Sequence, residues 1–221
     1  MTPLLVLNFK NFSSATGVNA VKLAKICEQF ARKNKKFQVV VAVSSIDLSA
    51  VAKVCSKCWV FSQHVDAAEY GAFTGSISIP VVKKYCQGTL LNHSEKKLSL
   101  VVLKRTISLC NKYRLKTLVC ADTIAEAKAV ARLSPSFVAV EPPDLIGSGV
   151  SVSTASPQFV VNTINAVKKI NKKLPVLVGA GVSTAVDVRS SLELGANGVL
   201  VASAFAKNKT PKKWLNALGL K

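Results

Sequence analysis

Short apolar runs alternate with longer segments of helical spacing along the whole of this chain. We expect strands at eight of the short runs, which span residues 4–7, 37–43, 59–62, 89–91, 117–120, 137–140, 176–178 and 198–201. Between them, apolar residues recur at the three- and four-residue spacing of an amphipathic helix. Strands that alternate with helices form a parallel sheet, because parallel neighbours need a long crossover connection.

The helical segments also predict which faces pack on the sheet. Residues 157–170 give the clearest pattern, with Ser156-Pro157 as the helix start and Val160, Ile164, Val167 and Ile170 on one stripe. Corresponding stripes in three other segments are Val18, Val21, Ile26 and Phe30; Val101, Ile107 and Leu109; and Ala125, Ala129 and Leu133.

Eight strand–helix units favour a closed (β/α)8 barrel. The strands are apolar on both faces, as in a sheet that helices cover. At 221 residues the chain is near the short end of the usual barrel size, so we expect trimmed loops and helices. An open doubly wound sheet is the alternative, although no GxGxxG follows the first run. No linker divides the chain, and residues 1–221 are predicted to form a single domain.

The charge balance is strongly basic, with 30 Lys and Arg against 11 Asp and Glu, a net charge of +19. The bases cluster near the ends of helical segments, for example at 32–36, 168–173 and 207–213, where cations complement the helix dipole. Aromatic residues lie mostly in apolar segments and do not interleave these clusters, as base stacking would require. We therefore predict a solvated basic surface and no specific nucleic-acid partner.

Location and metal binding can also be judged from the residue pattern. The longest apolar runs are about half of the roughly 20 residues that span a bilayer, and the first residues lack a basic leader. We expect a cytoplasmic protein with no membrane partner. Cys55 and Cys58 form a single CxxC with no second pair or histidine to complete a zinc site, so no metal is predicted. Redox chemistry at this pair is a weaker alternative.

Polar side chains follow several of the predicted strands. Asn8 and Lys10 follow the first strand, His93 and Glu95 the fourth, and Glu141 the sixth. The carboxyl ends of the strands carry the chemistry in barrels of this kind. A carboxylate that ends an apolar strand is costly unless it is partnered or used. We therefore expect a base, a neutral donor and a cation to converge on one face.

Two turns on the same face indicate a phosphate site. Gly179-Ala-Gly181-Val-Ser183 follows the seventh strand and Ala202-Ser203 the eighth. Glycine lets the backbone approach a ligand, and a helix N-terminus offers free N–H groups to an anion. Tight turns with ordinary helix caps are the alternative. Residues 142–149, with two prolines before a glycine-containing tip, are typical of a lid over a substrate.

Six segments, taken together, point to a known family. They are Asn8-Phe-Lys10, Gln63-His-Val-Asp66, Thr74-Gly75, Thr89-Leu-Leu-Asn-His-Ser-Glu95, Ala139-Val-Glu-Pro-Pro-Asp-Leu-Ile-Gly147 and Gly179-Ala-Gly-Val-Ser183. In this order and spacing they resemble the triosephosphate isomerase family, and the short length and Glu-Pro-Pro lid are similar to its archaeal branch. Phe73 and Ala204 depart from that branch, which usually has histidine and glycine at these positions.

The resemblance implies a TIM barrel that interconverts dihydroxyacetone phosphate and glyceraldehyde 3-phosphate through an enediolate, without a cofactor, in glycolysis and gluconeogenesis. It implies that Glu141 is the base, that neutral His93 polarises the carbonyl, and that Lys10, oriented by Asn8, supplies positive charge. Supporting roles would fall to Glu95, Asn92 and Thr74, and backbone N–H groups of Ile146 or Gly147, Gly181 or Ser183, Ala202 and Ser203 would hold the phosphate.

The resemblance also implies a homo-oligomer. The 66–76 loop would insert into a neighbouring subunit beside Lys10 and His93, so activity would require at least a dimer; dimer and tetramer both remain open. Two other functions are alternatives. A different phosphate-binding barrel enzyme would keep the two turns but not use Lys10, His93 or Glu141. A nucleic-acid-binding protein on an idle barrel would bind tightly, with a steep salt dependence and no turnover.

Overall fold

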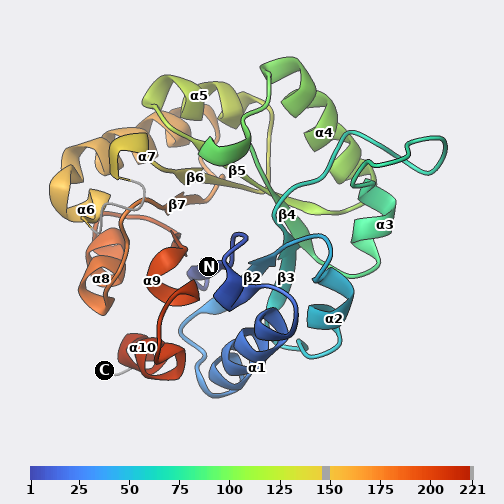
Figure 1. Cartoon of the computed structure of the whole chain (residues 1–221). Helices are drawn as coiled ribbons and strands as arrows, with labels where there is room; N and C mark the ends of the chain where they lie inside the picture. Colours follow the sequence, from blue (N-terminus) through green and yellow to red (C-terminus); the bar gives the residue numbers. More distant parts are fainter. Residues whose placement is uncertain (146–149, 220–221) are drawn as a thin grey trace.

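The computed structural model describes residues 1–145 and 150–219. Eight parallel strands close into a barrel in sequence order (Figure 1). The strands are β1 (Leu4–Asn8), β2 (Gln38–Val43), β3 (Trp59–Ser62), β4 (Gly88–Leu91), β5 (Lys116–Ala121), β6 (Phe137–Val140), β7 (Val176–Val178) and β8 (Gly198–Val201). The (β/α)8 prediction is confirmed, and each strand boundary lies within one residue of its predicted position. The tip of the predicted lid, with Ile146 and Gly147, lies outside the described residues.

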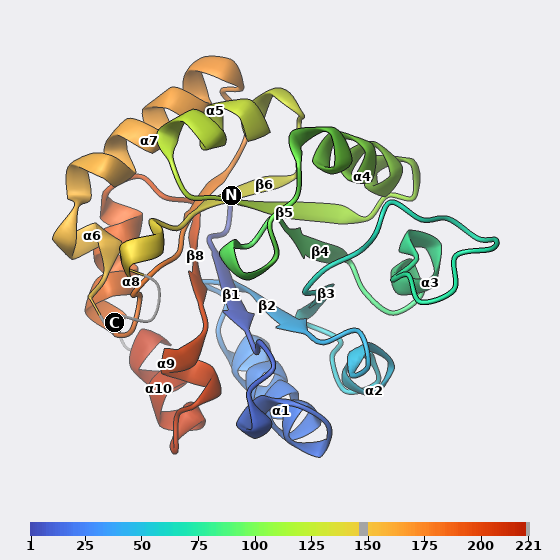
Figure 2. The same cartoon turned by 45° about the horizontal axis from the view of Figure 1, so that its top comes forward.

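Helices surround the barrel (Figures 1 and 2). The longer ones are α1 (Val18–Lys33), α4 (Leu100–Lys112), α5 (Ile124–Arg132), α7 (Pro157–Ile170), α8 (Ala185–Glu193) and α10 (Pro211–Gly219). The short helices are α2 (Leu48–Ala52), α3 (Ile79–Lys83), α6 (Val152–Ala155) and α9 (Ser203–Ala206), with 3-10 turns η1 (Ser13–Ala15), η2 (Ser94–Lys96) and η3 (Pro143–Leu145). Since α2 and α3 have five residues each, the expected trimming is confirmed. None of the described helices is both long and apolar enough to span a membrane.

Side chains alternate between the two faces of each strand, and this alternation fills the barrel interior and orients the polar side chains of the site. Leu4 and Val6 of β1 belong to the interior cluster, whereas Leu5 and Leu7 belong to the layer between sheet and helices. Successive side chains of a strand point to opposite faces, so Asn8 continues the inward series of β1. By the same period, Glu141 continues the inward series of Phe137 and Ala139. The sheet therefore directs both polar side chains toward the mouth of the barrel.

The predicted packing face is confirmed for α7. Val160, Ile164 and Val167 are buried there, and Ile170 is half-buried against the same core. Hydrophobic burial of this stripe holds α7 on the barrel.

Three other predicted faces are partly wrong. Val18 and Val101 are 73% and 79% exposed, because each lies in the first two residues of its helix, beyond the part that packs on the sheet. Helix α5 is rich in alanine, so more than one stripe of it is apolar. It buries Ala127, Val130 and Ala131 and leaves Ala125 exposed, with Ala129 and Leu133 half-buried.

Candidate active site

Glu141 follows β6 at the mouth of the barrel. Its side chain is buried, and Oε2 has no hydrogen-bond partner among the described residues. The backbone of Gly179 passes so close that a Cβ there would lie 2.5 Å from Cγ and Oε1 of Glu141. Burial, reinforced by the Glu141 carboxylate, raises the pKa of the Cys120 thiol, which therefore stays protonated beside it. A buried carboxylate with an unengaged oxygen is placed to accept a proton.

His93 faces Glu141 from the end of β4. Its Nδ1 accepts a hydrogen bond from the backbone N–H of Glu95 at 3.2 Å, where the chain enters η2. A neutral imidazole whose Nδ1 accepts must carry its proton on Nε2. His93 Nε2 lies 3.8 Å from Glu141 Oε2, too far for a direct hydrogen bond. The two side chains thus present a donor and an acceptor to the same space.

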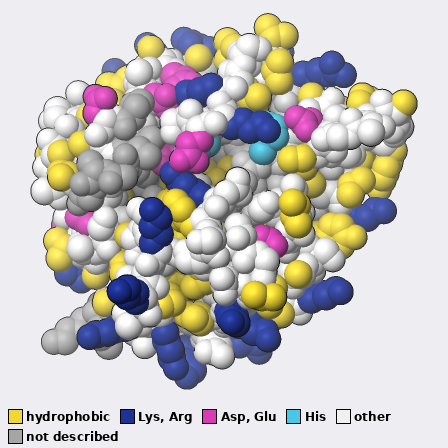
Figure 3. All heavy atoms as spheres, viewed as in Figure 1, with side chains coloured by type: hydrophobic (Ala, Val, Ile, Leu, Met, Phe, Trp, Pro, Cys, Tyr) yellow, Lys and Arg dark blue, Asp and Glu magenta, His cyan; other side chains and the backbone are white. Residues whose placement is uncertain are grey.

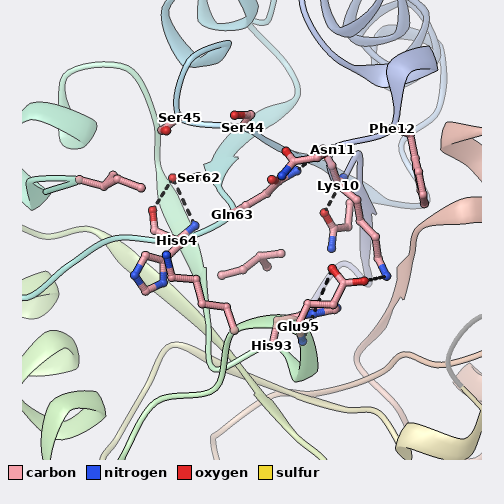
Figure 4. A pocket seen from close by; sticks show the side chains of 14 residues that line it. Lys10, Asn11, Phe12, Ser44, Ser45, Ser62, Gln63, His64, His93 and Glu95 are labelled. Carbon is pink, nitrogen blue, oxygen red and sulfur yellow. Dashed lines mark hydrogen bonds and ion pairs between the residues drawn. The ribbon is translucent and has the colours of Figure 1, made fainter. Parts of the chain in front are cut away.

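Lys10 is held in a strained backbone conformation. Its φ of 47° lies in the left-handed region, which is unusual for a residue other than glycine. Asn8 Oδ1 accepts the Lys10 N–H at 3.0 Å, and Gln63 Nε2 donates to the Lys10 carbonyl at 2.9 Å. The Lys10 ammonium lies 2.7 Å from Oε1 of Glu95, and Figure 4 shows the two side chains meeting beside His93. Strain held by several partners is typical of a functional position.

Asn92 and Thr74 occupy very different places. Asn92 Nδ2 donates to the Cys120 carbonyl and to Glu126, while its Oδ1 accepts the Leu98 N–H, so it ties the His93 loop to β5 and α5. Burial opposes the charge of Glu126, but these and neighbouring hydrogen bonds still hold its pKa below the usual range. Thr74 is exposed in a loop between β3 and α3 that projects from the barrel (Figure 2).

The turn after β7 combines positive φ angles with a helix cap. Ala180 and Gly181 have φ of 58° and 70°, and a Cβ on Gly181 would overlap the Val150 carbonyl. The Ser183 N–H donates to Asp187 at 3.0 Å, and the Ser183 hydroxyl donates to the Gly181 carbonyl at 2.9 Å. A phosphate that used the Ser183 N–H would therefore compete with Asp187.

Two cavities meet at the mouth. The smaller, of about 260 Å³, is bordered by Lys10, His93, Glu141, the turns after β7 and β8, and Lys207. The larger, of about 450 Å³, also touches Lys10 and His93 but extends away toward Ser44, Ser45 and His64 (Figure 4). Base, donor and cations meet around the smaller cavity, which can hold a small anion with a reactive carbonyl.

Trp214, which the sequence patterns did not single out, braces this cavity from behind. Its indole N–H donates to the Ser183 carbonyl at 2.7 Å. The Trp214 ring packs on Phe205 with ring centroids 5.8 Å apart, and Phe205 packs on Phe9 at 6.0 Å. This aromatic chain joins the loops after β1, β7 and β8. The sequence did hold a signal for this residue. A tryptophan in the last helix has an indole N–H that needs a hydrogen-bond partner when the side chain is half-buried.

Lys207 was also missed as a site residue. It appeared in the sequence as one base among many in the 207–213 cluster. In the structure its ammonium lies 4.4 Å from the ring centre of Phe12 and it lines the smaller cavity. Lys207 therefore adds a second cation to the cavity that Lys10 also lines. No group of three His, Cys, Asp or Glu side chains suited to a metal ion is found in the described part of the chain.

Comparison with known proteins fits this geometry. The family model described as triosephosphate isomerase matches residues 3–218. The chain belongs to the triosephosphate isomerase family. The triosephosphate isomerase of Methanothermus fervidus is 42% identical over 217 residues, which cover 98% of this chain and 97% of the relative. Those of Archaeoglobus fulgidus and Methanocaldococcus jannaschii are 41% and 40% identical over 216 residues, covering 97% of this chain and 96% and 98% of the relatives.

Membership of the triosephosphate isomerase family confirms the resemblance read from the motifs. The match spans nearly the whole barrel, including the ends of β1, β4, β6, β7 and β8, where the candidate residues lie.

Proposed function

We propose that this chain carries out the isomerisation of its family, interconverting dihydroxyacetone phosphate and glyceraldehyde 3-phosphate, with Glu141, His93 and Lys10 as catalytic residues. The assignment rests on one observation above all: Oε2 of Glu141 and Nε2 of His93 face each other at 3.8 Å on the wall of the smaller cavity. Proton abstraction beside a carbonyl needs an acceptor and a donor in this relation.

The proposed reaction moves one proton between two carbons and one between the oxygens that they carry, and it changes no net oxidation state. Oε2 of Glu141 takes a proton from the carbon next to the substrate carbonyl, and the freed electron pair forms the carbon–carbon double bond of the enediolate. The N–H of His93 donates to the oxygen on which negative charge develops, with the Lys10 ammonium nearby. Glu141 then returns the proton to the neighbouring carbon, while the hydroxyl proton of the first carbon passes by way of His93 to the former carbonyl oxygen, so that the first carbon becomes the new carbonyl. The buried setting of Glu141 strengthens these interactions because it excludes water.

The phosphate is assigned to the turns after β7 and β8. Gly181, Ser183, Ala202 and Ser203 border the smaller cavity together with Glu141. The Lys10 and Lys207 side chains supply positive charge there. Backbone N–H groups at the start of α9 have no partner within that short helix, as at any helix N-terminus, and suit an anion.

The isomerisation assay tests the proposal. Glyceraldehyde 3-phosphate is supplied to the purified chain and formation of dihydroxyacetone phosphate is coupled to NADH oxidation, with inorganic phosphate added as a competitor. We expect turnover that phosphate inhibits competitively. Turnover absent from assembled, phosphate-free protein would favour another phosphate-binding barrel enzyme.

The larger cavity supports a second proposal, that the active form is at least a dimer. This cavity borders Lys10, His93 and Glu95 on the side away from Glu141. None of residues 66–76 lines this cavity, and the loop that they form projects from the barrel of its own chain (Figure 2). The base of the loop is held by a hydrogen bond of 2.7 Å from the Ile77 N–H to the Asp66 carboxylate. A loop from a neighbouring copy would fill this space and bring Thr74 near Glu95.

Mixing two inactive variants tests this arrangement. Glu141→Gln removes the base from its own subunit, whereas Thr74→Glu would place a carboxylate against Glu95 of the neighbour. In a hybrid dimer, the Thr74→Glu subunit keeps its own Glu141 and receives an intact loop. We expect the mixture to exceed the summed activity of the separate variants. A mixture that only adds the two activities would refute the shared site.

We also propose a cytoplasmic location. The six cysteines are free thiols and five of them are buried. Free thiols are usual in reducing compartments and rare in secreted proteins. Cell fractionation with an antibody to the chain checks this location.

A further inference from the structure

The face of the barrel opposite the mouth, which we call the basal face, collects basic side chains. All eight strands are parallel, so every crossover helix ends near the face where the strands begin. Helix α1 ends in Arg32 and Lys33 and is followed by Lys35 and Lys36, all of them exposed. Helix α4 ends the same way, in exposed Lys112.

The densest part of the basal face lies at the paired ends of α5 and α7. These helices run side by side (Figures 1 and 2). Arg132 ends α5, Lys169 lies in the last turn of α7, and Lys172 and Lys173 follow it. Arg132, Lys172 and Lys173 line a shallow groove of about 570 Å³. Among the described residues, none of these four bases has an ion-pair partner.

The carboxylates lie mostly on the other face. Figure 3 views the molecule from the mouth and shows Asp and Glu side chains around the histidines. Near the basal ends of the helices, Glu28 is bonded to Arg32 and to backbone N–H groups of residues 56–58, and Glu69 is bonded to Lys112. Glu193, exposed at the end of α8, is the other carboxylate near these ends among the described residues. The positive charge of the basal face is therefore largely unneutralised.

Helix dipoles explain only part of this pattern. Cations in the last turn of a helix are stabilised by the dipole, but the effect fades beyond that turn. Lys35, Lys36, Lys172 and Lys173 lie past the last turns of α1 and α7. Their mutual repulsion would be relieved by a polyanion that spans several of them.

We propose that the basal face binds the phosphate backbone of double-helical nucleic acid without reading its sequence. Backbone contacts of this kind need clustered Lys and Arg and little else. Membrane binding would be strengthened by exposed apolar side chains, and single strands would need exposed aromatic ones. Among the large exposed apolar residues, Ile46, Val101 and Val186 lie toward the mouth. Met1 and Tyr85 are exposed on the basal side, before β1 and after α3 rather than at the ends of α5 and α7, and Trp59 is half-buried beneath Lys116.

Two variants of equal charge change test the place of binding. Lys169→Gln, Lys172→Gln and Lys173→Gln together remove three exposed cations from the basal face. The matched control is Lys209→Gln, Lys212→Gln and Lys213→Gln, whose residues are equally exposed but lie on the flank beside α1. Binding of a labelled mixed-sequence DNA duplex is followed by fluorescence anisotropy across a salt series, with vesicles of anionic phosphatidylserine as a second probe.

We expect wild-type affinity for the duplex to fall by about a thousandfold between roughly 50 and 200 mM salt, as for five or six phosphate contacts. The basal variant should bind at least about tenfold more weakly and with a flatter salt slope, since each lost contact flattens it by about one unit. The control should bind like wild type. Isomerase turnover should be unchanged in the basal variant. It should also be unchanged in wild type at saturating duplex, because duplex bound to the basal face leaves the mouth open.

Several results would overturn the proposal. Equal weakening in both variants would mean that net charge alone drives binding. Inhibition of turnover by the duplex would place binding at the mouth instead. Absence of duplex binding at low salt, or binding to vesicles without binding to duplex, would exclude nucleic acid as the ligand. None of these results depends on which residues perform the isomerisation.

Discussion

Substituting Gly179 by alanine should disable Glu141 as the base, although Glu141 itself is unchanged in this variant. The added Cβ would lie 2.5 Å from Cγ and Oε1 of Glu141 and 2.7 Å from its Cδ, whereas ordinary contacts begin at 3.4 Å. The carboxylate must therefore move by about 1 Å, and a misplacement of that size costs on the order of 100-fold in rate. The clash falls on a side chain rather than on backbone, so the stability cost should be about 1 kcal/mol, as for one off-rotamer side chain.

A double-mutant cycle isolates this effect. Turnover is measured for wild type, Gly179→Ala, Glu141→Asp and the double variant, and urea unfolding checks that each is folded. Aspartate is one methylene shorter and leaves room for the new Cβ, so alanine at 179 should cost little in that background. Gly179→Ala with wild-type kcat, or strictly additive losses, would refute the steric reasoning.

Three further predictions concern residues around the site and the core. Burial opposes the charge of Glu28, but backbone N–H groups of residues 56–58 and the Ser56 hydroxyl lower its pKa to about 2. A carboxyl pKa below its usual value stabilises the fold above pH 4.5, and this stabilisation is lost as the pH falls toward 2. In urea unfolding at pH 7, Glu28→Gln should therefore lower the free energy of unfolding by about 3 kcal/mol. A stability difference between wild type and variant that did not shrink in acid would count against this. Trp214→Phe removes one hydrogen bond to the Ser183 carbonyl, worth about 1 kcal/mol. Steady-state kinetics should therefore show KM raised about fivefold at similar kcat. An unchanged KM would mean that Trp214 does not support the substrate-binding turn. Asn92→Ala removes three hydrogen bonds behind His93 and should lower both kcat and Tm. With each bond worth about 1 kcal/mol and half of the loss felt at the site, kcat should fall by about tenfold. Normal kcat at a lower Tm would make the role of Asn92 purely structural.

The strands were predictable because a closed barrel buries both faces of its sheet. Most strands therefore appear in the sequence as mainly apolar runs, and the polar residues that follow them mark the mouth. That logic places Asn8, His93 and Glu141 with no knowledge of contacts. Helix faces were less predictable, since Ala125 and Ala129 are as apolar as Ala127 and Ala131, which α5 buries.

Other parts of the site depend on contacts that no local pattern records. Trp214 reaches Ser183 across 31 residues, and Lys207 gains its place by lying over Phe12. The engagement of the Ser183 N–H by Asp187 arises from helix capping, which competes with ligand binding at the same turn. Thr74 cannot be placed from one chain, because its proposed site belongs to a neighbouring copy.

In the proposed mechanism Glu141 transfers the substrate proton, and a pair of matched variants tests this role. Glu141→Gln keeps the shape of the side chain and removes its basicity, and Glu193→Gln makes the same change on an exposed residue at the far end of α8. Both variants are assayed for kcat with glyceraldehyde 3-phosphate after their unfolding curves are matched to wild type. We expect kcat to fall by at least about 100-fold for Glu141→Gln, as for the loss of a general base, and to stay at the wild-type value for Glu193→Gln. Near-normal kcat in folded Glu141→Gln would mean that a group other than Glu141 takes the substrate proton.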